Sequence, residues 1–562
     1  MSRVKIFCDN ITPNEVDIEA GMTLKQIAES LKVECEQPII AAYVNNRVKE
    51  LGYRLFNSAI VNFVDLTSYA GMRVYQRTIS LVLQCAVEEL IGSCVLYIRH
   101  TMGVNGLYCE VEREDGSIIP LGEEMITALV VKMREIIDAD EPIICQKLPT
   151  DQVRDIYKKR NYTDKIQLLD TRPRLFSEIY RLRDSVGYFY GSLAPSTGYV
   201  SHYALECYHH GFYLGLPCRN NPSVIGSSPT QEKMYGVFQF HQHWIDIMGV
   251  QTVGALNTKV LAGGSSEMIK LGEALADRAI IGVADAIYNA YVDRGCRIVM
   301  IAGPSSSGKT TTAKRLSIQL QIMGYHPVLI SMDNYFIDRD KTPKDENGEY
   351  DFEVLEAINL ELFNNHLNAL LAGESVEIPR YDFLSGTSHP SGKHLSLEQR
   401  GVLIIEGIHG LNPRLTEHID QNKIFRLYTS CFTTVAMDNA SRISSSDNRL
   451  IRRLTRDFAH RGNSAVNTLR RWASVRRGEE QYIFPFQENA DCMLNTAMFY
   501  EIAVLKPFAE RILREVPNTT IEFEEAKRLL KFLDHFIVID PSEISPTSTI
   551  REFIGGSSFE VE

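Results

Sequence analysis

The sequence lacks the long apolar runs that a membrane-spanning helix needs. We find no uninterrupted apolar stretch of about 18 residues, and the N-terminus lacks the apolar segment of a signal peptide. The eleven cysteines are scattered, with no CxxC pair and no spacing typical of a disulfide framework. That pattern favours a reducing compartment. We therefore expect a cytoplasmic enzyme with no membrane partner.

The chain also lacks an excess of positive charge. Its formal net charge is −12, which argues against a general nucleic-acid binder, although a local basic patch would still permit tRNA or ribosome binding. At 562 residues the chain is longer than a single hydrophobic core supports, so we expect three or four domains.

The most informative motif present is a complete phosphate-binding loop of the form GxxxxGK[ST] at residues 303–310. A β-branched apolar run precedes it and a stretch with helical spacing follows it, so strand, loop and helix come in the required order. Gly303 and Gly308 allow the tight turn that aims backbone N–H groups at phosphate. Lys309 is expected to reach the β- and γ-phosphates, and the Thr310 hydroxyl to face Mg²⁺. The plain alternative is a chance Gly-Ser turn.

Two further strands are predicted to end in acidic residues. The run 326–332 leads to Asp333, and the run 401–405 leads to Glu406. In an open α/β sheet, ligands lie beyond the carboxyl ends of the strands. Asp333 is therefore predicted to accept the proton of a substrate hydroxyl, and Glu406 to bind Mg²⁺ directly or through water. The alternatives are an aspartate that forms a turn and a glutamate that caps a helix.

Four arginines follow at helical spacing. Arg449, Arg452, Arg453 and Arg456 stand at i, i+3, i+4 and i+7, which places them on one face of a helix. Such a face is either solvated surface or a lid that closes on ATP, and the guanidinium geometry favours the lid. We predict catalytic roles for Arg449 and Arg452. The predicted nucleotide-binding residues are Gly303, Pro304, Ser305, Ser306, Ser307, Gly308, Lys309, Thr310, Thr311, Arg453 and Arg456.

Together these segments resemble the uridine kinase and phosphoribulokinase family of P-loop kinases. The matching segments are 303–310, 331–336, 350–352, 381–383, 405–407 and 449–457. The resemblance implies a parallel sheet covered by helices on both faces, ATP or GTP as phosphate donor, and Mg²⁺. It implies Asp333 as the base and Glu406 and Thr310 as metal ligands. It implies that the Asp351 region and the Tyr381-Asp382 pair contribute to the nucleoside pocket. The substrate-binding residues we predict are Asp333, Tyr335, Asp351, Tyr381, Asp382 and His389, with His389 as a substitute for the family's base-reading histidine. In uridine kinases the base-reading histidine follows the Tyr-Asp pair more closely than His389 does here.

The N-terminal half is similar to the front of threonyl-tRNA synthetase. Residues 42–51 resemble its ubiquitin-like TGS domain, and residues 74–78 resemble the opening of its editing domain. The two histidines that the editing domain carries on a helix are replaced here by Arg77 and Leu81, so we do not expect editing chemistry. The fold class we predict is multidomain α+β and α/β: a TGS-like module over 1–67, an editing-like domain with a connecting helix over 68–290, and a kinase domain over 291–562. This order is similar to that of long bacterial uridine kinase-like proteins.

Local patterns predict helices at 24–31, 78–90, 267–291 and 524–536, and a strand at 536–539. A histidine and cysteine cluster in the middle region, which includes His202, Cys207 and His209, is interpreted as packed histidines rather than a zinc site.

The function we expect is transfer of a phosphoryl group from ATP or GTP to the 5′-hydroxyl of uridine or cytidine. Two alternatives stay open. One is a kinase for another hydroxylated metabolite. The other is a nucleotide-switched regulator that binds tRNA or the ribosome. We also expect a homo-oligomer.

Overall fold

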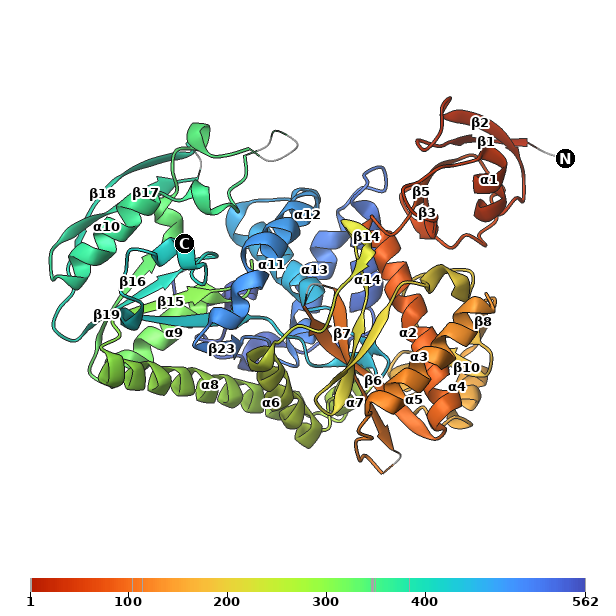
Figure 1. Cartoon of the computed structure of the whole chain (residues 1–562), viewed down its shortest axis with the longest axis horizontal. Coiled ribbons are helices and arrows are strands. Elements are labelled where there is room, and N and C mark those ends of the chain that lie inside the picture. The colour runs from red at the N-terminus through yellow and green to blue at the C-terminus, as the bar shows by residue number, and fades with distance from the viewer. Residues whose placement is uncertain are drawn as a thin grey trace.

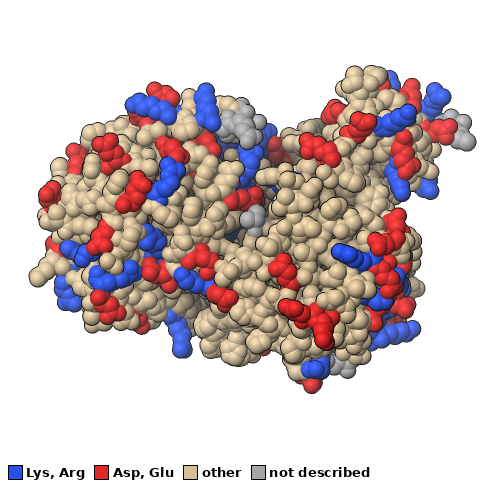
Figure 2. Space-filling model, in the orientation of Figure 1, with Lys and Arg blue, Asp and Glu red and all other residues tan. Residues whose placement is uncertain are grey.

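The computed structural model describes residues 3–103, 105–113, 115–344, 348, 350–383 and 385–560. In Figure 1 the N-terminal sheet and the parallel sheet of the C-terminal half lie at opposite ends of the molecule. Within the described ranges, no helix has both the length and the apolar character that crossing a membrane requires. On the face in Figure 2, acidic and basic side chains are interspersed rather than gathered by sign.

The N-terminal module is a five-stranded mixed sheet with one helix. Its elements are β1 (Arg3–Phe7), β2 (Glu15–Glu19), α1 (Leu24–Leu31), β3 (Ala41–Val44), β4 (Val48–Lys49) and β5 (Ala59–Val64). The strand order is β2-β1-β5-β3-β4, with β1 and β5 parallel. Thr23 and Gln26 form a capping box at the start of α1, and Leu24 and Ile27 are buried beneath it. The prediction of a helix at 24–31 is confirmed.

The middle region contains two larger antiparallel sheets, one two-stranded antiparallel sheet and several helices. Its elements are α2 (Tyr69–Ile91), β6 (Cys94–Met102), β7 (Gly106–Arg113), α3 (Glu123–Asp138), β8 (Ile144–Pro149), α4 (Thr150–Lys158), α5 (Thr163–Asp170), β9 (Phe176–Leu182), β10 (Ser185–Gly187), β11 (Ala204–Tyr208), β12 (Gly211–Gly215), β13 (Pro217–Cys218) and β14 (Asn221–Ile225). The two larger sheets have the orders β11-β12-β7-β6 and β10-β9-β8. Helix α2 includes the predicted helix at 78–90 and extends it at its N-terminal end.

Three helices connect this region to the C-terminal half: α6 (Glu232–Met248), α7 (Val253–Leu261) and α8 (Ser265–Arg294). Helix α8 includes the predicted helix at 267–291 and crosses the domain boundary that the sequence suggested at 290/291. Its last turns pack on the C-terminal sheet through Ile280, Val283 and Ile287.

The C-terminal half is built on a five-stranded sheet in which every pair of neighbours is parallel. Its elements are β15 (Ile298–Ala302), α9 (Lys309–Ile322), β16 (His326–Ser331), α10 (Leu360–Leu371), β17 (Val376–Asp382), β18 (Thr387–Leu395), β19 (Gly401–Glu406), β20 (Ile424–Ser430), β21 (Ala436–Asp438), β22 (Ser441–Arg442), α11 (Ser445–Arg461), α12 (Ala465–Tyr482), β23 (Cys492–Asn495), α13 (Glu501–Arg514), α14 (Phe523–Leu533) and α15 (Arg551–Ile554). The order is β16-β19-β15-β20-β23.

Alternate side chains of the central strand β15 bury into two different cores. Val299 and Ile301 pack with α8 and α9, whereas Ile298 and Met300 pack with α10 on the other face. The alternation follows from the period of two along a strand, and burial on both faces is typical of a parallel sheet. The predicted α/β architecture is thus confirmed for this half of the chain.

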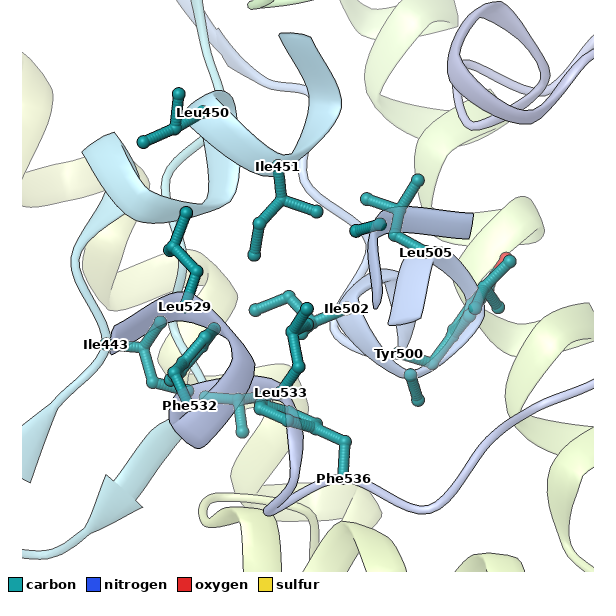
Figure 3. Close-up of a cluster of buried hydrophobic side chains, with 14 of the residues drawn as sticks. Ile443, Leu450, Ile451, Tyr500, Ile502, Leu505, Leu529, Phe532, Leu533 and Phe536 are labelled. Carbon is teal, nitrogen blue, oxygen red and sulfur yellow. The ribbon is translucent and has the colours of Figure 1, made fainter. Parts of the chain in front are cut away.

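A large core beside the sheet fixes the helices that surround the phosphate-binding loop. Figure 3 shows Ile451 of α11 pointing toward Ile502 of α13, with Leu529 and Leu533 of α14 nearby, and Leu450 of α11 belongs to the same buried cluster. Since the apolar side of α11 is held there, its opposite side, which carries the arginines, is held toward the loop.

The predicted strand at 536–539 is wrong. This segment forms no ladder in the described structure. Single hydrogen bonds hold it instead, from Ile537 N–H to Asn257 Oδ1 (2.9 Å) and from Ile539 N–H to the Ala503 carbonyl (3.3 Å). The apolar run arises because Phe536 and Ile539 bury against the helical core, which requires no partner strand.

The core in Figure 3 gives a stability prediction. Leu533 is fully buried, so Leu533→Ala should lower the free energy of unfolding by about 3 kcal/mol, from lost burial and a residual cavity. Leu175 is 86% exposed, so Leu175→Ala is the matched control and should change stability by less than about 0.5 kcal/mol. Thermal and urea unfolding would check this. Equal shifts for the two variants would contradict the burial that the structure shows.

Candidate active site

The phosphate-binding loop connects the central strand β15 to α9 and takes a backbone path that requires glycine. Gly308 has φ +82°, and Ser306 has φ +58°. At Gly303 the constraint is space, because a Cβ atom there would lie 2.0 Å from the Thr429 carbonyl oxygen at the end of β20. The loop therefore sits directly on the carboxyl edge of the sheet, where ligands of open α/β sheets bind.

Lys309 folds back onto the loop. Its Nζ donates to the carbonyls of Gly303 (3.0 Å) and Pro304 (3.3 Å). Burial lowers the pKa of Lys309, while the carboxylates of Glu406 and Asp333 act in the opposite direction. The ammonium group thus lies among the groups that the sequence predicted around the phosphates. Two of its three N–H donors bind loop carbonyls, which leaves one donor for a phosphate.

Two carboxylates, those of Glu406 and Asp333, lie near the Lys309 ammonium group. Glu406 ends β19, in register with Ile301 of β15 and Ser331 of β16, and accepts a hydrogen bond from Ser331 Oγ (3.3 Å). Burial raises the pKa of Glu406 to about 7; Lys309 lowers it, and Asp333 adds to the increase. Asp333 is exposed, in the single-turn helix η2 (Met332–Tyr335) that follows β16.

These groups fit Mg²⁺ chemically. The Glu406 carboxylate and the Thr310 hydroxyl, in the first turn of α9, are hard oxygen donors of the kind that this ion prefers, and Mg²⁺ commonly takes one or two protein ligands while keeping several waters. The structure brings Lys309, Asp333 and Glu406 together; their roles in catalysis stay predictions.

Arg449 and Arg452 donate hydrogen bonds to backbone carbonyls of the phosphate-binding loop. Arg449 donates to the Ser305 carbonyl (3.1 Å) and forms a bidentate pair with Glu479, in which Nη2 and Oε2 are 2.7 Å apart. Glu479 also accepts the Ser305 N–H (3.2 Å). Arg452 donates to the carbonyls of Ser306 (3.3 Å) and Thr496 (2.9 Å) and pairs with Glu501.

Arg449 and Arg452 are more deeply buried than the other two arginines on this face of α11. Arg449 is 2% exposed and Arg452 is fully buried, so in this structure both guanidinium groups bind loop carbonyls instead of solvent. Arg453 and Arg456 are partly exposed. Arg453 donates to Ser305 Oγ (3.0 Å), and Arg456 lies 3.6 Å from the Glu552 carboxylate. The geometry makes Arg453 and Arg456 the more accessible cations for a phosphate.

Three functional neighbours escaped the sequence reasoning. Glu552, in the C-terminal helix α15, accepts a hydrogen bond from the Thr311 hydroxyl (2.6 Å), although Thr311 was expected to bind phosphate. Thr496 Oγ1 donates to the Ser307 carbonyl (2.6 Å). Glu353 is partly buried, and burial raises its pKa to about 7, with Glu479 adding to the shift and Arg453 opposing it. No local motif marks any of these residues, because each is distant from the loop in sequence and is brought near it only by the tertiary structure.

The two predicted substrate tyrosines, Tyr335 and Tyr381, belong to one buried cluster beneath the site. Tyr335 is in the hydrophobic core, edge-on to Phe363, with its hydroxyl 3.2 Å from His366 Nδ1. Tyr381 is buried on β17, and its hydroxyl has no hydrogen-bond partner among the described residues.

His389 lies on the wrong side of its hairpin to act with Tyr381. It pairs in register with Arg380, whereas Tyr381 pairs with Ser388. Cross-strand partners share a face and adjacent residues point to opposite faces. His389 is therefore on the exposed face with Arg380, away from Tyr381.

Asp351 and Asp382 form local turn contacts. Asp351 Oδ1 accepts the Glu353 N–H (2.9 Å), and Asp382 Oδ2 accepts a hydrogen bond from Ser385 Oγ (3.0 Å). Their contact with a substrate stays a prediction.

The middle-region histidines and cysteines do not gather into a metal site. Among the residues that the structure describes, no group of three or more His, Cys, Asp or Glu side chains could hold a metal ion. His209 Nε2 instead lies 3.1 Å from the Glu232 carboxylate.

Comparison with known proteins agrees with this geometry. Residues 298–503 match the model of the phosphoribulokinase / uridine kinase family. A uridine kinase of Staphylococcus aureus (strain JH9) is 30% identical over 208 residues, which cover 37% of this chain and 91% of that protein. A uridine kinase of Halobacterium salinarum is 28% identical over 195 residues, 34% of this chain and 77% of that protein.

Among solved structures, a possible uridine kinase from Bacillus stearothermophilus is similar over 36% of this chain and 89% of that one, with 20% identity and a TM-score of 0.22. At that TM-score the similarity is too low to support an inference about this chain. The sequence match to the staphylococcal uridine kinase covers nearly all of that protein. The family-model match over residues 298–503 includes the loop, Lys309, Asp333 and Glu406. Through this segment the chain belongs to the phosphoribulokinase / uridine kinase family.

Proposed function

We propose that the chain is a nucleoside kinase that transfers the γ-phosphate of ATP or GTP to the 5′-hydroxyl of uridine or cytidine. The observation that carries the proposal is the gathering of Lys309, Asp333 and Glu406 around the phosphate-binding loop at the carboxyl edge of one parallel sheet. The family match supports phosphotransferase chemistry.

In this proposal the charge and position of each residue of the site determine its role. Asp333 is exposed at the end of β16, so its carboxylate orients the acceptor hydroxyl and accepts its proton. Lys309 donates to the β- and γ-phosphates, and Arg453 and Arg456 neutralise charge from the α11 side. Glu406 and Thr310 hold Mg²⁺, which screens the phosphate oxygens when bound. Arg449 and Arg452 act as positioning residues that keep the loop backbone in place.

A second acceptor class is favoured by one observation. His389, the nearest histidine after the Tyr381-Asp382 pair, lies on the opposite face of the hairpin from Tyr381. A pocket without that base-reading side chain would take another hydroxylated metabolite at the same Asp333 carboxylate.

An acceptor panel tests the proposal directly. We expect uridine or cytidine to be phosphorylated in the presence of ATP or GTP and Mg²⁺. Asp333→Asn should lower kcat by about 10²- to 10⁴-fold, because it removes the base while preserving shape. Lys309→Ala should remove activity to a similar extent. Asp340→Asn, an exposed aspartate in the same segment, is the control and should match the wild type.

Transfer measured with radiolabelled ATP separates the outcomes. Phosphorylation of other hydroxylated metabolites and of no nucleoside, still lost in Asp333→Asn, would replace the nucleoside assignment with the second class. Full activity in Asp333→Asn would contradict the mechanism.

The contact between Thr311 and Glu552 gives a separate prediction. Glu552 places a carboxylate beside the loop where phosphates are expected, so Glu552→Gln should lower the KM for ATP by about threefold to tenfold, by removing repulsion of about 1 kcal/mol. Glu543→Gln, an exposed residue in the same C-terminal segment, is the control. Steady-state kinetics with varied ATP would check it, and an unchanged or raised KM in Glu552→Gln would show that the carboxylate does not oppose nucleotide binding.

A further inference from the structure

A cavity of about 830 Å³ lies between the middle region and the kinase half. Its walls come from α2, from the loops around Tyr190 and Arg219, from the first turn of α11, from α12 and from the start of α14, elements that meet near the middle of the molecule in Figure 1. The volume is in the range of small-molecule sites. Lys309, Asp333 and Glu406 do not line it, so it is separate from the phosphate-binding loop.

The cavity is basic although the chain is acidic. Among the described residues its lining includes nine arginines and four carboxylates. Each carboxylate already has an arginine partner: Asp447 with Arg528 (2.7 Å), Glu525 with Arg73 (2.9 Å), Glu522 with Arg470 (2.8 Å) and Glu480 with Arg476 (3.0 Å). None of these four carboxylates forms an ion pair with Arg77, Arg219 or Arg442.

Three of those arginines form no ion pair with any described residue. Arg442 makes no hydrogen bond through its guanidinium group to the described chain, and its Nε is buried without a partner. Arg77 is held by one hydrogen bond, from Nε to the Ser192 carbonyl (3.0 Å). Arg219 donates to the Thr67 carbonyl and to the Tyr69 hydroxyl, both at 3.3 Å.

Arg77, Arg219 and Arg442 are each partly buried, and withdrawing unpaired charge from water is costly. Burial lowers the pKa of Arg77 to about 10 and lowers that of Arg442 as well. A buried cation is normally compensated by a counter-ion. Because the protein supplies none for these guanidinium groups, an anion from solution fits the site, and guanidinium forks match phosphate geometry.

The backbone beside Arg442 adds to this preference. The serines that begin α11, Ser444 to Ser446, line the cavity, and the Ser444 side chain makes no capping hydrogen bond. The N-terminus of this 17-residue helix thus presents its positive dipole end to the same space as the unpartnered Arg442.

The rest of the wall suits a flat ring. Tyr69, Tyr190 and Trp472 line the cavity, and the Arg219 guanidinium lies 4.1 Å from the centroid of the Tyr69 ring. Aromatic faces of this kind stack on planar heterocycles. A ligand with phosphate at one end and a heterocycle at the other would satisfy both halves of the lining.

We propose that this cavity is a second binding site, for a nucleotide, with Arg77, Arg219 and Arg442 on the phosphate and Tyr69, Tyr190 and Trp472 beside the base. The site shares Arg449 with the phosphate-binding loop: this side chain lines the cavity and donates to the Ser305 carbonyl. A nucleotide there would contact the same helix that holds the loop.

Binding to the full chain in a Lys309→Ala background tests the proposal. The chain contains two tryptophans, and Trp472 lines the cavity, so Trp244→Phe leaves a fluorescence signal that reports on it. The probes are UMP, ATP and inorganic phosphate, with calorimetry as a second readout. We expect a nucleotide to change Trp472 fluorescence, and Arg442→Gln to weaken its binding by at least about tenfold. Arg219→Gln, at a partly exposed position, is a second test should Arg442→Gln not fold.

Arg471→Gln is the matched control, since Arg471 is an exposed arginine of α12 outside the cavity lining, and it should bind like its parent. No binding of either nucleotide up to about 1 mM, or equal affinity in the arginine variants, would overturn the proposal. Inorganic phosphate binding as tightly as the nucleotides would overturn the assignment of the aromatic half. All binding is measured in the Lys309→Ala background, which lacks the loop lysine. These results therefore do not depend on whether the kinase assignment is correct.

Discussion

The buried ion pairs beneath the phosphate-binding loop are the contacts on which the site depends. Arg449 with Glu479 and Arg452 with Glu501 are nearly or fully excluded from solvent, and each arginine also binds a loop carbonyl. Breaking such a pair by removing one partner typically costs about 3–5 kcal/mol, because it leaves a buried charge uncompensated. The path of the loop is therefore fixed by charges from α11, α12 and α13 as well as by its own glycines.

The same helix explains how distant parts of the chain reach the site. The apolar side of α11 packs into the core with α13 and α14, its arginine side meets the loop, and its first turn opens into the cavity shared with α2. Arginines that hold the architecture are paired with carboxylates, whereas Arg77, Arg219 and Arg442 are not. This difference in pairing separates structural charge from charge that is available to a ligand.

Much of the kinase half could be predicted from the sequence, because its signals are local. The loop, its strand and its helix follow one another directly, and the acids at positions 333 and 406 stand at strand ends that a parallel sheet brings to one edge. The helix at 24–31 was also predictable, since its cap and apolar spacing lie within nine residues.

The remainder depends on contacts that no local pattern records. Helical spacing placed Arg449 and Arg452 on one face but did not show that this face is buried, since Glu479 and Glu501 are 30 and 49 residues away. Glu552 is 241 residues from Thr311. The strand at 536–539 was mistaken because burial against helices gives the same apolar run as a sheet. The TGS-like and editing-like assignments of the N-terminal half stay predictions.

The most direct measurement of the central claim is a crystal structure of the protein with Mg²⁺ and a non-hydrolysable ATP analogue. We predict the triphosphate within the loop at 303–310, Lys309 in contact with the phosphates, and Mg²⁺ beside Glu406 and Thr310. Arg449 and Arg452 should still bind their loop carbonyls. A nucleotide bound away from the loop would contradict this prediction. So would a nucleotide bound in the loop with Arg449 released from Glu479 and Arg452 released from Glu501.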